Sequence, residues 1–371
     1  MKNKKKTQRW VIKIGSSLLT NNGKGINCKV IGQWVEQIAY LKHHLNYQVI
    51  LVSSGAVAEG MSRLNWTTRP KALHELQAVA AIGQMGLIQA YENCFMHHDI
   101  KTAQILLTHD DLSNRQRYLN SRSTLRTLLS LGTVPIVNEN DTVVTDEIQF
   151  GDNDTLGALV ANLIEADALV ILTDQKGLYN KNPATHKDAT LIKSAQAEDK
   201  ELISMADRPG KFGTGGMITK ISAAKLAARS GTYTVIMAGN EPDGIRKLAN
   251  GDNIGTHLRA SQETMTARKC WLAGQLKVKG ELIIDAGAEK GLCQSGGSLL
   301  AVGITSVSGK FDRGELVSCI NHKGIEIARG LTNYNTGDIN QIKTFASNRI
   351  EKILGYVDEP EVIHRDNLVL L

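Results

Sequence analysis

Two lysines occupy positions where an ordinary surface lysine would be out of place. Lys13 lies inside the apolar run 10–14, which predicts a buried strand, and a charge there is costly unless it reaches an opposite charge. Lys220 follows the glycine-rich loop 213–216 in the first turn of a predicted helix, where the helix dipole disfavours a cation. An anionic ligand would remove both penalties. The pair therefore predicts a phosphate-binding site, with a solvent-facing lysine as the plain alternative for Lys220.

Turns rich in glycine and hydroxyl residues follow the first two predicted strands. Residues 15–17 read Gly-Ser-Ser and residues 53–55 read Ser-Ser-Gly, while Thr173 and Asp174 follow a later strand. In parallel sheets, ligands bind beyond the carboxyl ends of strands, and free N–H groups at helix starts attract anions. One such turn would be an ordinary strand–helix connection. Their repetition indicates a ligand-binding edge, and the Thr173 segment is consistent with a nucleotide contact.

Acidic and amide residues are concentrated in two further segments. Residues 138–141 read Asn-Glu-Asn-Asp and close a predicted strand, and residues 151–154 read Gly-Asp-Asn-Asp and introduce a helix. Asp154 could serve only as a helix N-cap. The two segments together suit a site that recognises an ammonium group and orients the lysines.

Several other sites and chemistries are disfavoured by spacing. The His-Arg-Asp triplet at 364–366 lacks the asparagine and the DFG motif of a protein kinase, and 213–220 does not fit a P-loop. The histidines at 43, 44, 97 and 98 lie on helical patterns and are expected at the surface. Five scattered cysteines form no CxxC pair and no zinc-ligand spacing, which is typical of reduced thiols.

The first 260 or so residues alternate apolar β-branched runs with helical patterns, which predicts an α/β domain with a mostly parallel sheet sandwiched by helices. The expected strands are 10–14, 48–52, 102–107, 133–137, 168–172 and 234–238. The expected helices are 31–43, 71–97, 120–131, 155–165 and 217–229.

After about residue 273 the sequence pattern changes to short strand-like runs separated by glycines, which predicts a second, smaller all-β domain of barrel type. Its expected strands are 281–285, 298–302, 316–320 and 325–329.

Charge and hydropathy bear on where in the cell the protein is expected. The net charge of +6 comes largely from the lysine-rich tail before Arg9, and the C-terminal region is close to neutral. No apolar run is long enough to span a membrane, and the tail lacks the apolar core of a signal peptide. A cytoplasmic location without membrane attachment is expected.

The motifs above match a known family: the chain resembles the glutamate 5-kinases, in which an amino acid kinase domain precedes a C-terminal PUA domain. The matching segments are 11–17, 52–56, 137–141, 151–154, 172–179 and 213–220, with 296–300 and 309–315 in the second domain. The resemblance implies a basic tail (1–8), a kinase domain (9–260), a linker (261–277), a PUA domain (278–357) and a C-terminal extension (358–371).

The resemblance also implies roles for individual residues. It makes Lys13, Lys220 and Asp154 catalytic, with Asp154 orienting both lysines, and it places glutamate against Ser54, Asp141 and Asn153. The residues it places against ATP are Lys13, Gly15, Ser16, Thr173, Asp174, Thr214, Gly215, Gly216, Met217, Ile218, Thr219 and Lys220.

The implied reaction is phosphorylation of the glutamate side chain by ATP with Mg²⁺, the first step of proline biosynthesis, with no protein metal ligand expected. The glutamate carboxylate, with a pKa near ~4.3, is already an ionised nucleophile and needs no general base. Proline is the implied feedback inhibitor, a dimer or tetramer the implied assembly, and a glutamyl phosphate reductase the implied recipient of the product.

Two alternatives remain open from the residues. Another amino acid kinase would act on N-acetylglutamate, aspartate, carbamate or UMP. An RNA-binding protein would use the PUA-like domain, although the near-neutral charge of that region disfavours RNA binding.

Overall fold

The computed structural model describes residues 7–20, 25–143, 153–205, 216–260 and 278–371. The chain forms two compact units. The first consists of Met1–Leu112 and Asn120–Ala267, and the second of Ser113–Leu119 and Arg268–Leu371. Within the described residues, no helix is both long and apolar enough to cross a membrane.

The first unit is built on an eight-stranded sheet in the order β3-β4-β2-β1-β5-β7-β8-β6. All six predicted strands are present and run parallel to one another: β1 (Arg9–Ile14), β2 (Gln48–Ser53), β3 (Thr102–Leu107), β4 (Val134–Glu139), β5 (Ala168–Thr173) and β7 (Tyr233–Ala238). Two short strands that the sequence did not reveal, β8 (Thr256–Arg259) and β6 (Ser194–Gln196), extend one edge, and β8 runs antiparallel to β7. The predicted mostly parallel sheet is confirmed.

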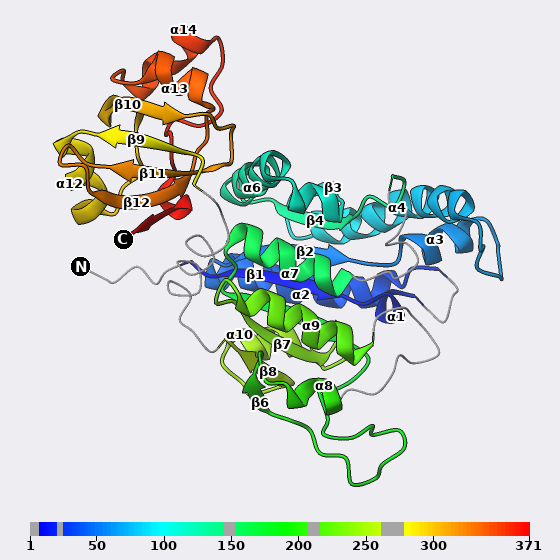
Figure 1. The fold of residues 1–371 in the computed structure, drawn as a ribbon. Coiled ribbons are helices and arrows are strands. Elements are labelled where there is room, and N and C mark those ends of the chain that lie inside the picture. Colours follow the sequence, from blue (N-terminus) through cyan, green and yellow to red (C-terminus); the bar gives the residue numbers. More distant parts are fainter. Residues whose placement is uncertain (1–6, 21–24, 144–152, 206–215, 261–277) are drawn as a thin grey trace. The chain divides into compact units, whose positions relative to one another are not determined.

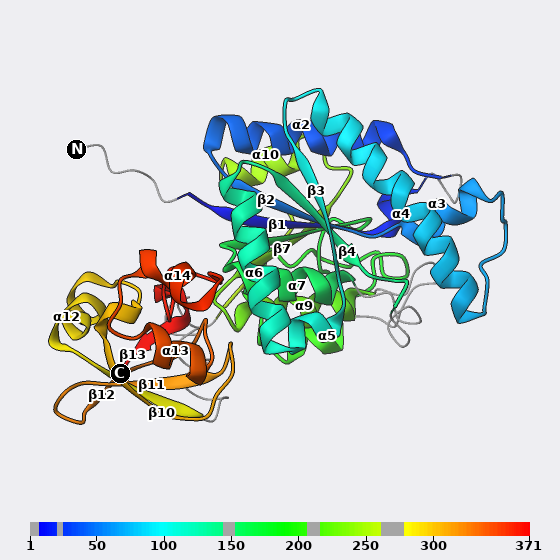
Figure 2. The same cartoon turned by 90° about the horizontal axis from the view of Figure 1, so that it is seen from above.

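Helices cover both faces of this sheet (Figures 1 and 2). One face carries α2 (Cys28–Leu45), α4 (Leu73–Met96) and α10 (Gly244–Ala249), and the other carries α6 (Arg115–Ser130), α7 (Asn153–Ile164) and α9 (Met217–Ala228). Short helices are α1 (Ser16–Leu19), α3 (Ala56–Arg63), α5 (His109–Ser113) and α8 (Glu201–Met205). Asn27 caps α2 by accepting from the Val30 N–H at 3.3 Å, and Asn46 ends it in the left-handed conformation.

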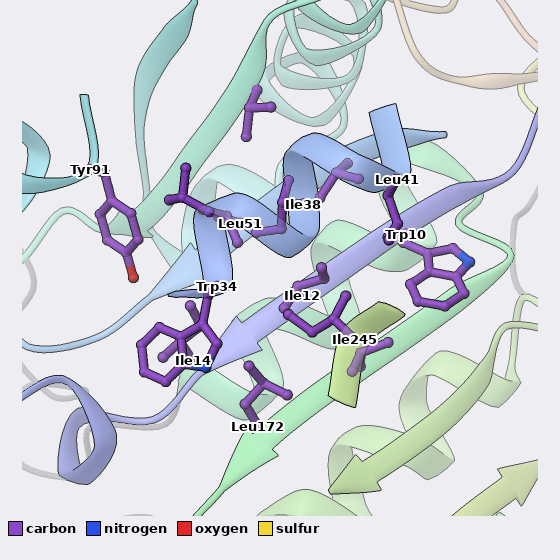
Figure 3. Packing of buried hydrophobic residues seen from close by; sticks show 14 of the residues in the cluster. Trp10, Ile12, Ile14, Trp34, Ile38, Leu41, Leu51, Tyr91, Leu172 and Ile245 are labelled. Atoms are coloured by element: carbon purple, nitrogen blue, oxygen red, sulfur yellow. The ribbon is translucent and has the colours of Figure 1, made fainter. Parts of the chain in front are cut away.

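Alternation along β1 decides which face receives each side chain. Trp10, Ile12 and Ile14 pack toward Trp34 and Ile38 of α2 in the main core (Figure 3). Each such fully buried side chain contributes roughly 1.5–3 kcal/mol of hydrophobic free energy. The residues between them therefore face the opposite side of the sheet, where α7 and α9 lie.

Lys13 is one of these alternate residues. A Cβ built on Gly157 of α7 would lie 3.5 Å from the Lys13 Cβ, an ordinary contact distance, so the lysine stem runs directly against this helix. The aliphatic stem is thus packed, and the ammonium is delivered to the carboxyl edge of the sheet.

The second unit contains a five-stranded sheet in the order β10-β9-β11-β12-β13. Its strands are β9 (Gly280–Ile284), β10 (Ile304–Gly309), β11 (Leu316–Ile320), β12 (Glu326–Leu331) and β13 (Leu368–Leu370), joined by α12 (Ala286–Ser295), α13 (Thr336–Ile342) and α14 (Ile350–Leu354). β9 and β11 are parallel, and the other neighbours are antiparallel. The predicted β-rich second unit is confirmed. Residues 362 and 363 lie in its core and β13 in its sheet.

The strand predicted at 298–302 is wrong. Leu299 makes a single bridge to Ile363, and Ala301–Gly303 form a turn of 3-10 helix before β10 begins at Ile304. Leu299 and Ala301 are buried whereas Leu300 and Val302 are exposed, so the alternation that suggested a strand is real. A strand also requires a ladder of partners, and this segment has only one bridge.

Candidate active site

The carboxyl ends of β1, β2, β4 and β5 meet at one edge of the sheet, because these strands are parallel neighbours. The short helices α1 and α3 begin there, directly after the turns that follow β1 and β2 (Figure 1). The backbone N–H of Gly15 donates to Leu172 O at 3.3 Å, which brings the first turn next to the end of β5.

Asp154 joins the two lysines at this edge. Its Oδ1 lies 2.7 Å from Lys13 Nζ and its Oδ2 lies 3.1 Å from Lys220 Nζ. The Thr219 hydroxyl is 2.8 Å from the same Oδ2. Although Asp154 is the second residue of α7, its side chain pairs with the lysines of two other elements, which goes beyond the capping role considered from sequence.

The electrostatics of this cluster favour an ionised carboxylate. Burial by itself raises the pKa of Asp154, but the charges of Lys13 and Lys220 and the hydrogen bonds from Lys13 and Thr219 outweigh it and lower the pKa to about 2.

The cluster carries an excess positive charge. The side chains of Asp154, Lys13 and Lys220 are 1%, 7% and 9% exposed, so two ammonium groups share one carboxylate away from bulk water. Neither lysine has a second carboxylate partner among the described residues. Holding an unmatched cation in such a place is costly unless an anion arrives. The geometry is therefore that of an anion-binding site.

The start of α9 adds backbone donors to the same region. Gly216 is the N-cap and offers no side chain, and Met217 and Ile218, both partly buried, form the first turn before Thr219 and Lys220. The Thr219 hydroxyl also lies 2.7 Å from Gly216 O. The remaining predicted residues of this loop, Thr214 and Gly215, lie outside the described residues, as does Asp152.

A second group of polar side chains lies beside this cluster and is built from amides and a hydroxyl. Asn153 Nδ2 donates to Ser54 Oγ at 2.9 Å, to Asn138 Oδ1 at 3.0 Å and to Ser53 O at 3.2 Å. The structure thus brings the predicted residues Ser54 and Asn153 together. It adds Asn138, to which the sequence assigned no role of its own although it closes β4.

Asp141 lies in the turn that follows β4. Burial raises its pKa to about 6, and the positive charge of Arg69 opposes that rise. Of the described residues, no cation lies within ion-pair distance of its carboxylate. A half-buried acid with no cation partner among the described residues is suited to receive an ammonium group from a ligand.

Thr173 and Asp174 end β5 at the same edge. The Thr173 hydroxyl donates to Asp174 Oδ1 at 3.0 Å, and Asp174 is exposed while Thr173 is buried. Gly177 follows with φ +155°, and a Cβ there would meet Thr256 Oγ1 at 2.6 Å. The glycine is required where this loop folds back onto β8. Ser16 is exposed and follows Gly15 in the turn that lies next to the end of β5.

No group of three or more His, Cys, Asp or Glu side chains within the described residues could hold a metal ion.

Comparisons with known proteins agree with this geometry. The model of the amino acid kinase family matches residues 8–238, and that of the PUA domain matches residues 280–354. A glutamate 5-kinase from Thioalkalivibrio sulfidiphilus is 60% identical over 99% of this chain and 98% of its own length. Another glutamate 5-kinase, from Hahella chejuensis, is 58% identical over 99% of this chain and 95% of its own length.

Among solved structures, a UMP kinase from Bacillus anthracis is 14% identical with a TM-score of 0.47, over 69% of this chain and 97% of its own. That likeness is too low to bear on the reaction. The match to the family model and the nearly full-length relatives carry the assignment. The chain belongs to the amino acid kinase family.

Proposed function

We propose that the chain transfers the γ-phosphoryl group of ATP to the side-chain carboxylate of L-glutamate and forms L-glutamyl 5-phosphate, the first step of proline biosynthesis. The observation that carries the proposal is the buried Lys13–Asp154–Lys220 cluster with its excess positive charge. The relatives that cover nearly the whole chain are glutamate 5-kinases, which supports glutamate as the acceptor.

The acceptor itself supplies the nucleophile. A glutamate side chain with a pKa near ~4.3 is ionised at neutral pH, so no residue has to remove a proton. The difficulty is to bring a carboxylate and a triphosphate together and to stabilise the charge that spreads over the transferred group. Lys13 and Lys220 meet this need by approaching the phosphates from two elements, and Asp154 holds both ammonium groups in position.

ATP would occupy the edge formed by β1, β5 and α9. Ser16 would donate to phosphate oxygens, and Gly15 would let them approach the backbone of the turn closely. The N–H groups at the start of α9 would also donate to phosphate oxygens. Thr173 and Asp174 would contact the nucleoside. No side chain among the described residues caps α1 at Gly15 or α9 at Gly216, which supports this interpretation of the two helix starts.

Glutamate would occupy the neighbouring group of amides. Asp141 would receive its α-ammonium group, since the half-buried carboxylate has no cation partner among the described residues. Ser54 and Asn153 would bind its carboxylate and ammonium ends through the hydroxyl proton and the amide oxygen, both left free by the bonds described above.

Mg²⁺ would accompany ATP and neutralise part of the phosphate charge when bound. Asp154 is committed to two lysines, and the exposed Asp174 is the other described acid at the nucleotide end. This donor set fits an ion held mainly by phosphates and water.

Four further properties belong to the same proposal. Proline shares the amino and carboxyl groups of glutamate and would compete for the Asp141 end. The exposed apolar residues Ile82 and Met85 of α4 support a homodimer or tetramer. The acyl phosphate is reactive and would pass promptly to a glutamyl phosphate reductase. A cytoplasmic enzyme is expected to serve such a pathway.

A hydroxylamine trap tests the acceptor. An acyl phosphate reacts with hydroxylamine to give a coloured hydroxamate, so the protein with ATP, Mg²⁺ and L-glutamate should form it. N-acetylglutamate should give little, and UMP cannot give any. Hydroxamate formed with N-acetylglutamate but not with glutamate would refute the proposed acceptor.

A further inference from the structure

Gln84 is a polar residue buried in the apolar helix α4. It is 8% exposed and stands between the buried residues Ala80 and Leu87 on the face that packs against the sheet. Its Oε1 accepts from Asn138 Nδ2 at 2.7 Å. Its Nε2 makes no hydrogen bond within the described residues, so Gln84 contributes to the network through its oxygen alone.

The hydrogen bonds between Gln84 and the glutamate end have one possible direction. The Ser53 carbonyl can only accept, so the group of Asn153 that faces it must be Nδ2. The same Nδ2 then requires an oxygen from Asn138, which turns Asn138 Nδ2 toward Gln84. The chain of hydrogen bonds ends at Gln84, whose Oε1 accepts from Asn138 Nδ2.

This direction leaves two groups available to a ligand. Ser54 Oγ accepts from Asn153, so its own proton is free to donate. Asn153 Oδ1 accepts no hydrogen bond from the described residues, because all three bonds of this side chain are made by Nδ2. If Asn138 lost its acceptor, its amide could turn over and set Nδ2 against Nδ2 of Asn153, which would disturb both free groups.

Helix α4, which carries Gln84, packs tightly against the segment from Ser53 to α3. A Cβ on Gly83 would lie 1.8 Å from Ala56 O, and one on Gly60 would lie 1.9 Å from Val79 O, so α3 and α4 touch through their backbones. One face of α4 also carries Tyr91, whose hydroxyl is 3.0 Å from Ser53 Oγ. Backbone contact with α3 and the Tyr91–Ser53 hydrogen bond therefore fix the position of α4 relative to Ser54.

We infer that Gln84 is a positioning residue for the acceptor substrate: through Asn138 it fixes the orientation of the Asn153 amide and the Ser54 hydroxyl. This inference rests on the proposed binding of glutamate by Ser54 and Asn153. Gln84 itself is not assigned a contact with glutamate.

The first test replaces Gln84 by methionine, which keeps the length of the side chain and removes the acceptor. The KM for glutamate should rise about tenfold, the scale of one lost buried hydrogen bond. The KM for ATP should stay within twofold, because Gln84 is not bonded to the lysine cluster. An unchanged KM for glutamate would overturn the inference.

A matched control is available on α2. Gln37 is also 8% exposed, and its Oε1 accepts from the Ile245 N–H at 2.9 Å, away from the polar group around Asn153. Gln37→Met should reduce stability without a selective change in the KM for glutamate. If both variants raised that KM alike, the effect would be general loosening and the inference would fail.

Two further variants keep the test decisive. Gln84→Glu retains an oxygen toward Asn138 and should keep the KM for glutamate nearer that of the unmodified chain, even if Gln84→Met folds poorly. A residue acting through Asn138 must also be non-additive, so adding Gln84→Met to Asn138→Leu should raise that KM no further. Additive effects would contradict the route through Asn138.

Asn153→Ala separates this inference from the proposed function. If Asn153→Ala raises the KM for glutamate and Gln84→Met does not, only the positioning role is wrong. If neither variant raises it, the proposed glutamate site itself is wrong.

Discussion

The phosphate end and the acceptor end of the site are built from different interactions. At the phosphate end, Lys13, Asp154 and Lys220 form a buried cluster of full charges. At the acceptor end, Asn153 and Ser54 form a network of neutral groups with fixed donor and acceptor directions. Coulomb attraction tolerates small changes in angle, so the first arrangement suits a group whose charge moves during reaction. Directional hydrogen bonds distinguish one small carboxylate from another, so the second suits recognition.

Removing one lysine should have the largest effect. Lys220→Ala should lower kcat by roughly 10²–10³-fold, because a charge aimed at the transferred phosphoryl group is lost where water cannot replace it. The variant should remain folded, since the truncated side chain leaves Asp154 paired with Lys13. Steady-state kinetics with saturating glutamate and ATP measure the change.

Lys225 is the control on the same helix. It is exposed in the last turn of α9, so Lys225→Ala should leave kcat unchanged. A folded Lys220→Ala variant that retains full turnover would sink the two-lysine model.

Neutralising Asp154, the carboxylate that both lysines share, should have the next largest effect, and this effect is on the free energy of unfolding. The pKa of Asp154 is lowered to about 2 from the ordinary value of 3.8, so the ionised group stabilises the fold above that ordinary value. The contribution, about 2 kcal/mol at neutral pH, is lost as pH falls from about 4 through 2. Asp154→Asn should therefore be less stable than the unmodified protein at pH 7, and the difference should shrink toward pH 2.5.

Urea unfolding of both proteins across that pH range measures the difference. A gap that stays constant from pH 7 to pH 2.5 would mean that Asp154 is not stabilised by the lysines.

The acceptor end should respond in the opposite sense. The pKa of Asp141 is raised to about 6, so the free protein loses stability as pH rises from about 4 through 6 and carries the full cost of the charge above that range. Asp141→Asn should stabilise the free protein at pH 8 while raising the KM for glutamate about tenfold, by loss of a charged partner for the ammonium group. An Asp141→Asn variant with an unchanged KM for glutamate, or with lower stability than the unmodified protein at pH 8, would contradict the role given to Asp141.

Glutamate saturation measured from pH 5 to pH 8 sharpens the same point. The KM for glutamate should rise below about pH 6 as Asp141 takes up a proton. In Asp141→Asn this limb of the profile should be absent. The terminal phosphate of ATP itself titrates in this range, so the KM for ATP should change with pH to the same extent in both proteins.

Much of the fold could be predicted because its signals are local. The six apolar strands of the first unit and the helices between them were predicted with their ends displaced by only a few residues, since buried parallel strands are uninterrupted runs of branched side chains. The strands β6 and β8 were missed because three or four residues carry too little periodicity. The strand predicted at 298–302 was wrong for a different reason. Its side chains do alternate between buried and exposed, but the segment makes only one bridge to another part of the chain.

The sequence by itself determined which residues could bind phosphate: a lysine within an apolar strand and another after a glycine loop are unfavourable without an anion, whatever the fold. Only the tertiary structure decided that Asp154 stands between them, at 2.7 and 3.1 Å, and that Gln84 reaches Asn138. The physical reason is distance along the chain. Lys13 and Asp154, or Gln84 and Asn138, are far apart in sequence, and local propensity carries no information about which side chains the packing of helices on a sheet brings into contact.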